Sequence, residues 1–229
     1  MTEIRPRLTR WILLAVMGTT ACGSAAQAGI EPSPRPAGLT PTEIEAIYKA
    51  RMDSARMQFT DADVRFMTGM IGHHAQALVM AGLVPTHGAS ASIRTLGARI
   101  INAQKDEIAR MEQWLRDREQ PVPEVHIDGS NLTVHGAEHA LHMPGMLTPD
   151  QLRELDQASG SDFDRLFLTF MIQHHRGAVT MVHNLFATDG AALDDVVFKL
   201  ASDIQVDQIT EVARMERMLS ALAPKDRSH

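Results

Sequence analysis

The chain has 229 residues, of which 44% are hydrophobic, and a formal charge of −6 at pH 7. This length can bury one sizeable core or two small ones, and the acidic balance without a long basic run argues against nucleic-acid binding. The single cysteine excludes an internal disulfide and a cysteine-based zinc site. Aromatic residues are few, at 4%, whereas 14 Met and 11 His are present, so the placement of these two residue types matters most.

The first 21 residues have the pattern of a bacterial export signal. Three Arg precede the apolar run 11–17, which is too short to span a membrane, a task that needs about 20 residues. Cys22 then stands where a lipoprotein would be cleaved and lipidated, although Thr19 is a poorer match to that motif than Leu. We favour this lipid anchor; the alternative is cleavage after Ala28, which would release a secreted protein. Both interpretations place the mature chain in the periplasm or cell envelope.

A tether is expected over residues 22–39, because its three central prolines favour an extended chain. Beyond it, N-cap residues and prolines at first helical positions mark successive helices. The predicted helices cover about 40–58, 60–85, 90–118, 148–158, 162–186 and 191–222. The segment between the third and fourth helices is irregular, with room for a short strand or two between residues 122 and 134.

A Met/His motif occurs twice, at an offset of 101 residues: residues 70–77 read MIGHHAQA and residues 171–178 read MIQHHRGA. The segments 104–115 and 208–219 likewise share Gln, Glu, Met and Leu at one spacing. The halves are therefore predicted to be copies of one helical unit, in an all-α protein built as one fused bundle or two abutting bundles. The predicted organisation is a first repeat at 40–118, a connection at 119–147, a second repeat at 148–222 and a tail at 223–229.

The histidines and methionines of the motif lie on neighbouring helix faces. Residues three or four apart touch on a helix surface, so Met70 can share a metal ion with either His73 or His74, whereas adjacent histidines point about 100° apart. Leu168 stands where the first copy has Met67, so the second site is poorer in sulfur. The main candidate metal ligands are Met70, His73, His74, Met80, Met171, His174, His175 and Met181. The secondary candidates are Met67, Met111, Met215, His139, His142, Met143 and Met146.

Polar residues also occur in the apolar face of the Gln/Glu/Met helices, where they require partners, because burying an unpaired polar group is costly. We expect them to accept the second N–H of the histidines and so to fix the imidazole tautomers. The candidate supporting residues are Gln104, Glu107, Gln208 and Glu211, together with Asp63 and Asp164, which precede the two His-His pairs.

The donor set indicates which metal such sites would take. Thioether sulfur is soft and imidazole is intermediate, so Met/His sites without cysteine suit Cu(I), or Ag(I) as its mimic, with other soft or borderline ions as alternatives. Zinc rarely binds Met, and a di-iron bundle needs Glu-x-x-His motifs, which the sequence lacks. The structural alternative is that the Met stripes are core filler. His126 has no partner in the pattern and is expected to be solvated.

The motifs resemble the signature of a bacterial family, the domain of unknown function numbered 305. The resemblance covers about residues 59–222 and is carried by the two His-His segments, by Pro144-Gly145-Met146 and by Gln208-x-x-Glu211-x-x-x-Met215. It implies a ferritin-like helical bundle and export and, since some members resemble periplasmic copper-handling proteins, binding of Cu(I) or Ag(I) through Met and His. The family carries no established enzymatic activity, so none is inferred for this chain.

The resulting hypothesis is an envelope protein that binds copper for sequestration, tolerance or delivery, with an envelope copper-handling protein as a candidate partner. Two alternatives stay open. One is a ferritin-like redox enzyme that depends on a bound metal, and the other is a metal-free helical interaction module.

Overall fold

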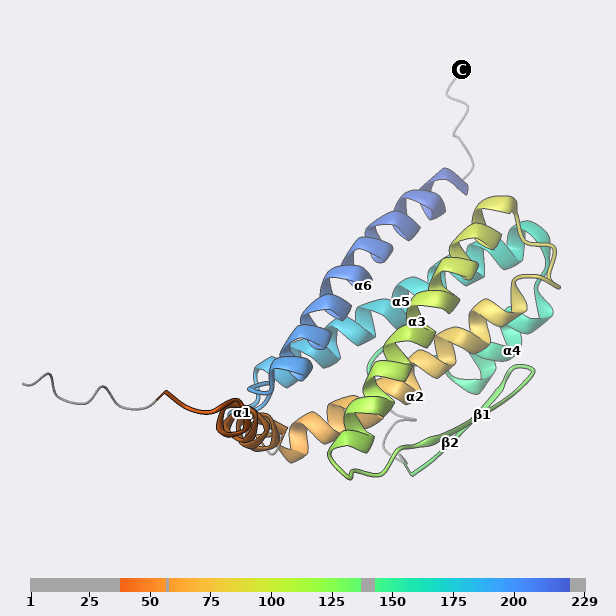
Figure 1. The fold of residues 1–229 in the computed structure, drawn as a ribbon. Helices are drawn as coiled ribbons and strands as arrows, with labels where there is room; N and C mark the ends of the chain where they lie inside the picture. The colour runs from red at the N-terminus through yellow and green to blue at the C-terminus, as the bar shows by residue number, and fades with distance from the viewer. Residues whose placement is uncertain (1–37, 57, 137–142, 223–229) are drawn as a thin grey trace, which may run out of the picture. The chain divides into compact units, whose positions relative to one another are not determined.

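The computed structural model describes residues 38–56, 58–136 and 143–222 (Figure 1). Its elements are α1 (Pro41–Arg56), α2 (Asp61–Leu83), α3 (Ala91–Asp117), β1 (Glu124–Asp128), β2 (Asn131–His135), α4 (Pro149–Gln157), α5 (Gly160–Phe186) and α6 (Asp195–Leu222). All of them belong to one unit that begins at Pro41. A bilayer-spanning helix is not found among the helices described. The expected signal sequence, the lipidation site Cys22, the tether up to residue 37, His139, His142 and the tail lie outside the described residues.

Local sequence explains where the helices begin. Thr60 caps α2: its hydroxyl accepts the N–H of Asp63 at 3.3 Å, and the Asp63 carboxylate accepts the N–H of Thr60 at 2.8 Å, which completes a capping box. Thr148 caps α4 in the same way. The last helix begins at Asp195, later than the sequence indicates, because Asp194 is its cap and accepts the backbone N–H groups two and three residues further on.

The four long helices form one fused bundle. α2 packs against α3, α5 packs against α6, and the two halves meet through α2 and α5, the helices that carry the His-His pairs (Figure 1). Both large apolar clusters mix the halves: one contains Leu96 of α3 with Phe167 of α5, and the other contains Ile71 of α2 with Ile204 of α6. The prediction of a mostly helical, duplicated fold is confirmed, and the shared cores decide for one bundle over two.

Two buried aspartates join the halves at the helix ends. Asp63 of α2 accepts the N–H of Ala192, in the loop before α6, at 2.7 Å. In the other half, Asp164 of α5 accepts the N–H of Ser90, the N-cap of α3, at 3.1 Å. Each aspartate lies ten residues before the first histidine of its helix, which is about 15 Å of helix. Their expected place beside the histidines is therefore wrong: they cap the loop of the opposite repeat.

The connection between the repeats holds the β1–β2 hairpin and then a segment, residues 143–147, that we call the strap. Leu147 exchanges two hydrogen bonds with the side-chain amide of Gln76 on α2, at 2.7 and 3.0 Å. On α5, a Cβ atom at Gly177 would lie only 2.0 Å from the carbonyl oxygen of Pro144. Gly145 adopts a φ of 78°, which favours glycine. The strap therefore packs backbone against backbone on α5 while it is hydrogen-bonded to α2.

Replacing Gly177 with Ala should destabilise the protein by about 1–3 kcal/mol, because the added methyl group overlaps the strap backbone. The matched control is Gly82→Ala in α2, where a Cβ meets nothing within 4 Å. That change should raise the free energy of unfolding by up to about 1 kcal/mol, since Ala is the better helix former. Urea unfolding measures the free energy of unfolding of both variants. Equal stability of Gly177→Ala and Gly82→Ala would contradict the close approach of the strap to α5.

Candidate metal centre

Four histidines are buried where α2 packs on α5. His73 and His74 come from α2, His174 and His175 come from α5, and none is more than 1% exposed. The rings of His73 and His174 are in contact and tilted, with centroids 3.8 Å apart and planes inclined at 36°. Nε2 of His174 lies 3.0 Å from the backbone oxygen of His73, and Nε2 of His73 lies 3.0 Å from the backbone oxygen of Pro144 in the strap. These two imidazoles thus link α2, α5 and the strap at one point.

The other two histidines each face a glutamate of the neighbouring helix. Nε2 of His74 lies 2.6 Å from Glu107 Oε2 on α3, and Nε2 of His175 lies 2.7 Å from Glu211 Oε2 on α6. The two pairs are related by the duplication and have nearly the same geometry. The glutamates therefore make the contact that the sequence suggested for them.

These contacts fix the tautomers of the imidazoles. Every Nε2 faces a carbonyl or carboxylate oxygen, which can only accept, so each Nε2 carries the donated hydrogen. A neutral imidazole of this kind keeps its lone pair on Nδ1. All four Nδ1 atoms are buried and have no hydrogen-bond partner. A buried polar atom without a partner costs about 1–3 kcal/mol, so four in one place require an explanation.

Two of these imidazoles are held neutral by their surroundings. Burial is the main cause that lowers the pKa of His73 to about 3, helped by the nearby His74 and His175 and opposed by the hydrogen bond to Pro144. The pKa of His174 is also well below the usual range, because of burial and then of the three other histidines. Their Nδ1 lone pairs therefore stay free of protons at neutral pH and can serve as ligands.

The predicted glutamines behave differently from the glutamates. Gln104 and Gln208 are 1% and 2% exposed, and the Oε1 atom of each has no hydrogen-bond partner, so neither accepts a histidine N–H. Asp207 on α6, which the sequence analysis missed, lies near both glutamates: its pKa is raised by partial burial and by the charges of Glu107, Glu211 and Asp203. Its position four residues before Glu211 on the same helix could have indicated this proximity, because residues four apart are neighbours on a helix surface.

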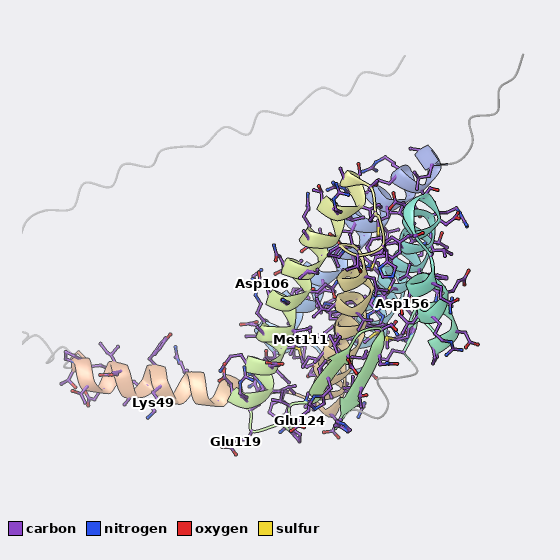
Figure 2. All side chains as sticks on the ribbon, turned by 90° about the vertical axis from the view of Figure 1, so that its right-hand side faces the viewer. Lys49, Asp106, Met111, Glu119, Glu124 and Asp156 are labelled. Atoms are coloured by element: carbon purple, nitrogen blue, oxygen red, sulfur yellow. The ribbon has the colours of Figure 1, made fainter. Side chains whose placement is uncertain are left out.

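The methionines divide into two groups that each combine both halves. One apolar cluster includes Met67, Met70, Met111 and Met181, with Met143 packed against it. The other includes Met80, Met171 and Met215. Met80 and Met181 therefore pack with the partner motif instead of with their own. Met111 on α3 is labelled in Figure 2.

The strap methionines lie at the margin of this arrangement. The Sδ atom of Met143 is 2.9 Å from where a Cβ of Gly69 would be, and the Met181 methyl group is 3.8 Å from the same point. These two side chains also line an open cavity of about 270 Å³ beside Phe66. Met146 lines a different cavity, with Gln76 and Leu147. Of the secondary ligands, the structure thus brings Met143 toward the Met67 and Met70 cluster and leaves Met146 apart from it.

The described part of the chain holds no ready metal site made of three nitrogen or oxygen side-chain donors. No three His, Cys, Asp or Glu side chains converge there closely enough to hold one ion. The histidines would need a thioether as a further donor. Met70 and Met171 are both fully buried, and each precedes the first histidine of its pair by three residues, about one helical turn.

Comparisons with known proteins identify the family and support the helical fold. A model of the family described as a domain of unknown function, DUF305, matches residues 63–219. Similar solved structures include a DUF305 fragment from Deinococcus radiodurans, with 29% identity and a TM-score of 0.59 over 71% of this chain and 98% of that one. A DUF305 protein from Streptomyces coelicolor, described as a candidate secreted protein, has 25% identity and a TM-score of 0.59 over 73% and 96% of the two chains.

A third similar structure is CopM in its Cu(I)-bound form, with 27% identity and a TM-score of 0.53 over 72% of this chain and 99% of that one. CopM has also been solved with Cu(II) and with Ag, and these structures match with TM-scores of 0.53 and 0.52. No curated protein matches the sequence.

Lowering the pH should destabilise the metal-free protein. A histidine whose pKa is depressed by folding binds protons more readily in the unfolded chain, so its contribution to stability is complete above pH 6.5 and is lost as the pH falls toward about 3. For His73 and His174, the free energy of unfolding should fall by about 1 kcal/mol each between pH 7 and pH 5.5.

Urea unfolding of chelator-treated protein across this range measures the effect. His73→Gln should remove part of the pH dependence, whereas His183→Gln, at an exposed position of α5, should leave it unchanged. Identical pH dependence in both variants would show that the buried imidazoles are not its source.

Proposed function

We propose that this chain, which belongs to the DUF305 family, binds soft monovalent metal ions, Cu(I) above all, at the buried histidines and methionines of its bundle. The observation that carries the proposal is the set of four buried imidazoles whose Nδ1 atoms have no partner. The similarity to CopM, solved with Cu(I) and with Ag, supports the same metal class. Sequestration, tolerance or delivery of copper is the role that follows.

The donors fit such an ion. Neutral imidazole nitrogen and thioether sulfur are the groups that Cu(I) accepts in the absence of cysteine. Glu107 and Glu211 hold His74 and His175 in one tautomer, as supporting carboxylates do for metal-bound histidines elsewhere. In the first half Met67 and Met70 both supply sulfur, whereas Leu168 replaces one of them in the second. The first half should therefore bind more tightly.

The remaining ligand assignments follow the same pattern. Met70 would serve with His73 or His74, and Met171 with His174 or His175. Met80, Met181, Met111, Met215 and Met143 are further sulfur donors of the two clusters, and His139, His142 and Met146 are candidates from the connection. An envelope location with a lipid anchor at Cys22, and transfer to an envelope copper-handling partner, complete the proposal.

Cu(I) titration against a competing chelator under reducing conditions tests the proposal. Met70→Leu and Met171→Leu conserve volume, so each should keep the fold and lower Cu(I) affinity, by about tenfold or more for Met70→Leu. Met218→Leu on α6, outside the assigned ligand set, is the matched control. Wild-type affinity no tighter than micromolar, or equal loss in all three variants, contradicts the proposal.

Two other results would identify the alternatives. Catalytic oxidation of Cu(I) or Fe(II) by the loaded protein would identify a ferritin-like redox enzyme. Protein isolated from its own cell envelope without any metal would instead support a metal-free interaction module.

The fixed tautomers also predict the ligand atom. On addition of Ag(I), the ¹⁵N resonances of the buried imidazoles should shift at Nδ1, while the Nε2–H groups stay protonated, because each is hydrogen-bonded to an oxygen. Nitrogen-detected NMR of histidine-labelled protein measures both atoms. Coordination through Nε2 would mean that the hydrogen bonds of the metal-free protein must break on binding.

A further inference from the structure

The outer face of the β1–β2 hairpin carries two imidazoles that the proposed Cu(I) centre does not use. Along both strands, side chains alternate between the two faces. Val125, Leu132 and Val134 form an apolar cluster with Met143, and the hairpin packs against α2. This anchoring fixes the backbone from which the outward side chains project.

The outward side chains include His126 and His135, both exposed. In the register of the hairpin, Glu124 lies opposite His135 and His126 lies opposite Thr133, so the two histidines are diagonal neighbours on one face. Their ring centroids are 5.7 Å apart, with planes inclined at 68°. The expectation that His126 has no partner is therefore wrong. Glu124, at the start of β1 in Figure 2, places Oε2 3.9 Å from Nε2 of His126.

We infer that His126 and His135 form a second metal site on this face, which binds one divalent ion of borderline softness such as Zn²⁺ or Cu²⁺. Two imidazoles that share an ion at metal–nitrogen distances of about 2.1 Å have ring centroids roughly 4.5–6.5 Å apart, depending on the angle at the metal. The observed separation lies inside that range. Both side chains are exposed, so rotation about their side-chain bonds can turn a ring nitrogen of each toward a shared ion.

The neighbouring donors determine the metal class. The site rests on the two imidazoles, because no three His, Cys, Asp or Glu side chains of the described residues converge on one point; Glu124, with Oε2 3.9 Å from Nε2 of His126, adds negative charge beside it. Nitrogen and oxygen donors suit Zn²⁺ and Cu²⁺, whereas Cu(I) prefers the sulfur-containing sites of the bundle. Water completes the coordination at this solvated surface.

Calorimetric titration of the full chain with Zn²⁺ tests the inference. His126→Asn and His135→Asn should each weaken Zn²⁺ binding by at least about tenfold, since the loss of a residue that merely supports a ligand already costs that much. His183→Asn, which changes an exposed histidine on α5, should bind Zn²⁺ as the wild type does. X-ray absorption of the Zn²⁺ complex should count two imidazoles.

The proposed hairpin site and the Cu(I) centre can be tested independently, because they share no residue. Met70→Leu should leave Zn²⁺ affinity unchanged, and His126→Asn should leave the Cu(I) stoichiometry unchanged. Because both hairpin histidines are exposed, their replacement should not alter thermal stability in the absence of metal. Zn²⁺ binding that survives in both hairpin variants, or that is equally reduced in His183→Asn, overturns the inference.

Discussion

The bundle depends on the contact between His73 and His174. Two neutral imidazoles in ring contact lie at the junction of the two halves, and each donates its Nε2–H to a backbone oxygen outside its own helix. Charging either ring would place a cation in a buried site beside other histidines, which explains why their pKa values are depressed. Protonating either ring at Nδ1 would therefore destabilise the junction of α2, α5 and the strap, although the Nε2–H hydrogen bonds could persist.

The same contact breaks the symmetry of the duplication. His174 donates to the backbone of His73, but His73 does not make the reciprocal contact and donates instead to Pro144, in the connection between the repeats. The connection occurs once in the chain, so the two halves cannot be equivalent even where their helices match. A soft ion would consequently meet two related but unequal surroundings, with more sulfur in the first half.

Apart from Arg118 Nε, the unpaired buried side-chain atoms of the described residues all belong to histidines and glutamines of the four long helices. The four Nδ1 atoms and the Oε1 atoms of Gln104 and Gln208 have no partners, whereas Asp63 and Asp164, at the helix ends, are fully engaged with backbone N–H groups. The two aspartates at the helix ends are hydrogen-bonded, whereas the Nδ1 atoms of the four histidines are not, and leaving these atoms unpaired lowers the stability of the metal-free protein. Metal binding would recover that cost, because a metal ion takes up the lone pairs that no hydrogen bond uses.

Local sequence signals predict the helices, the duplication and a polar partner for the histidines, with Glu and Gln both as candidates. Caps, prolines and helical spacing are local signals, and the buried Glu107 and the half-buried Glu211 both require a partner on an apolar helix face. The sequence by itself could not determine which repeat each side chain would meet. The tertiary structure decided that Asp63 and Asp164 cap the opposite half, that Met80 and Met181 pack with the other motif and that His126 meets His135 across a hairpin. These contacts depend on the packing of α2 on α5 and on strand register, which join residues distant in the chain and leave no periodic trace within either segment.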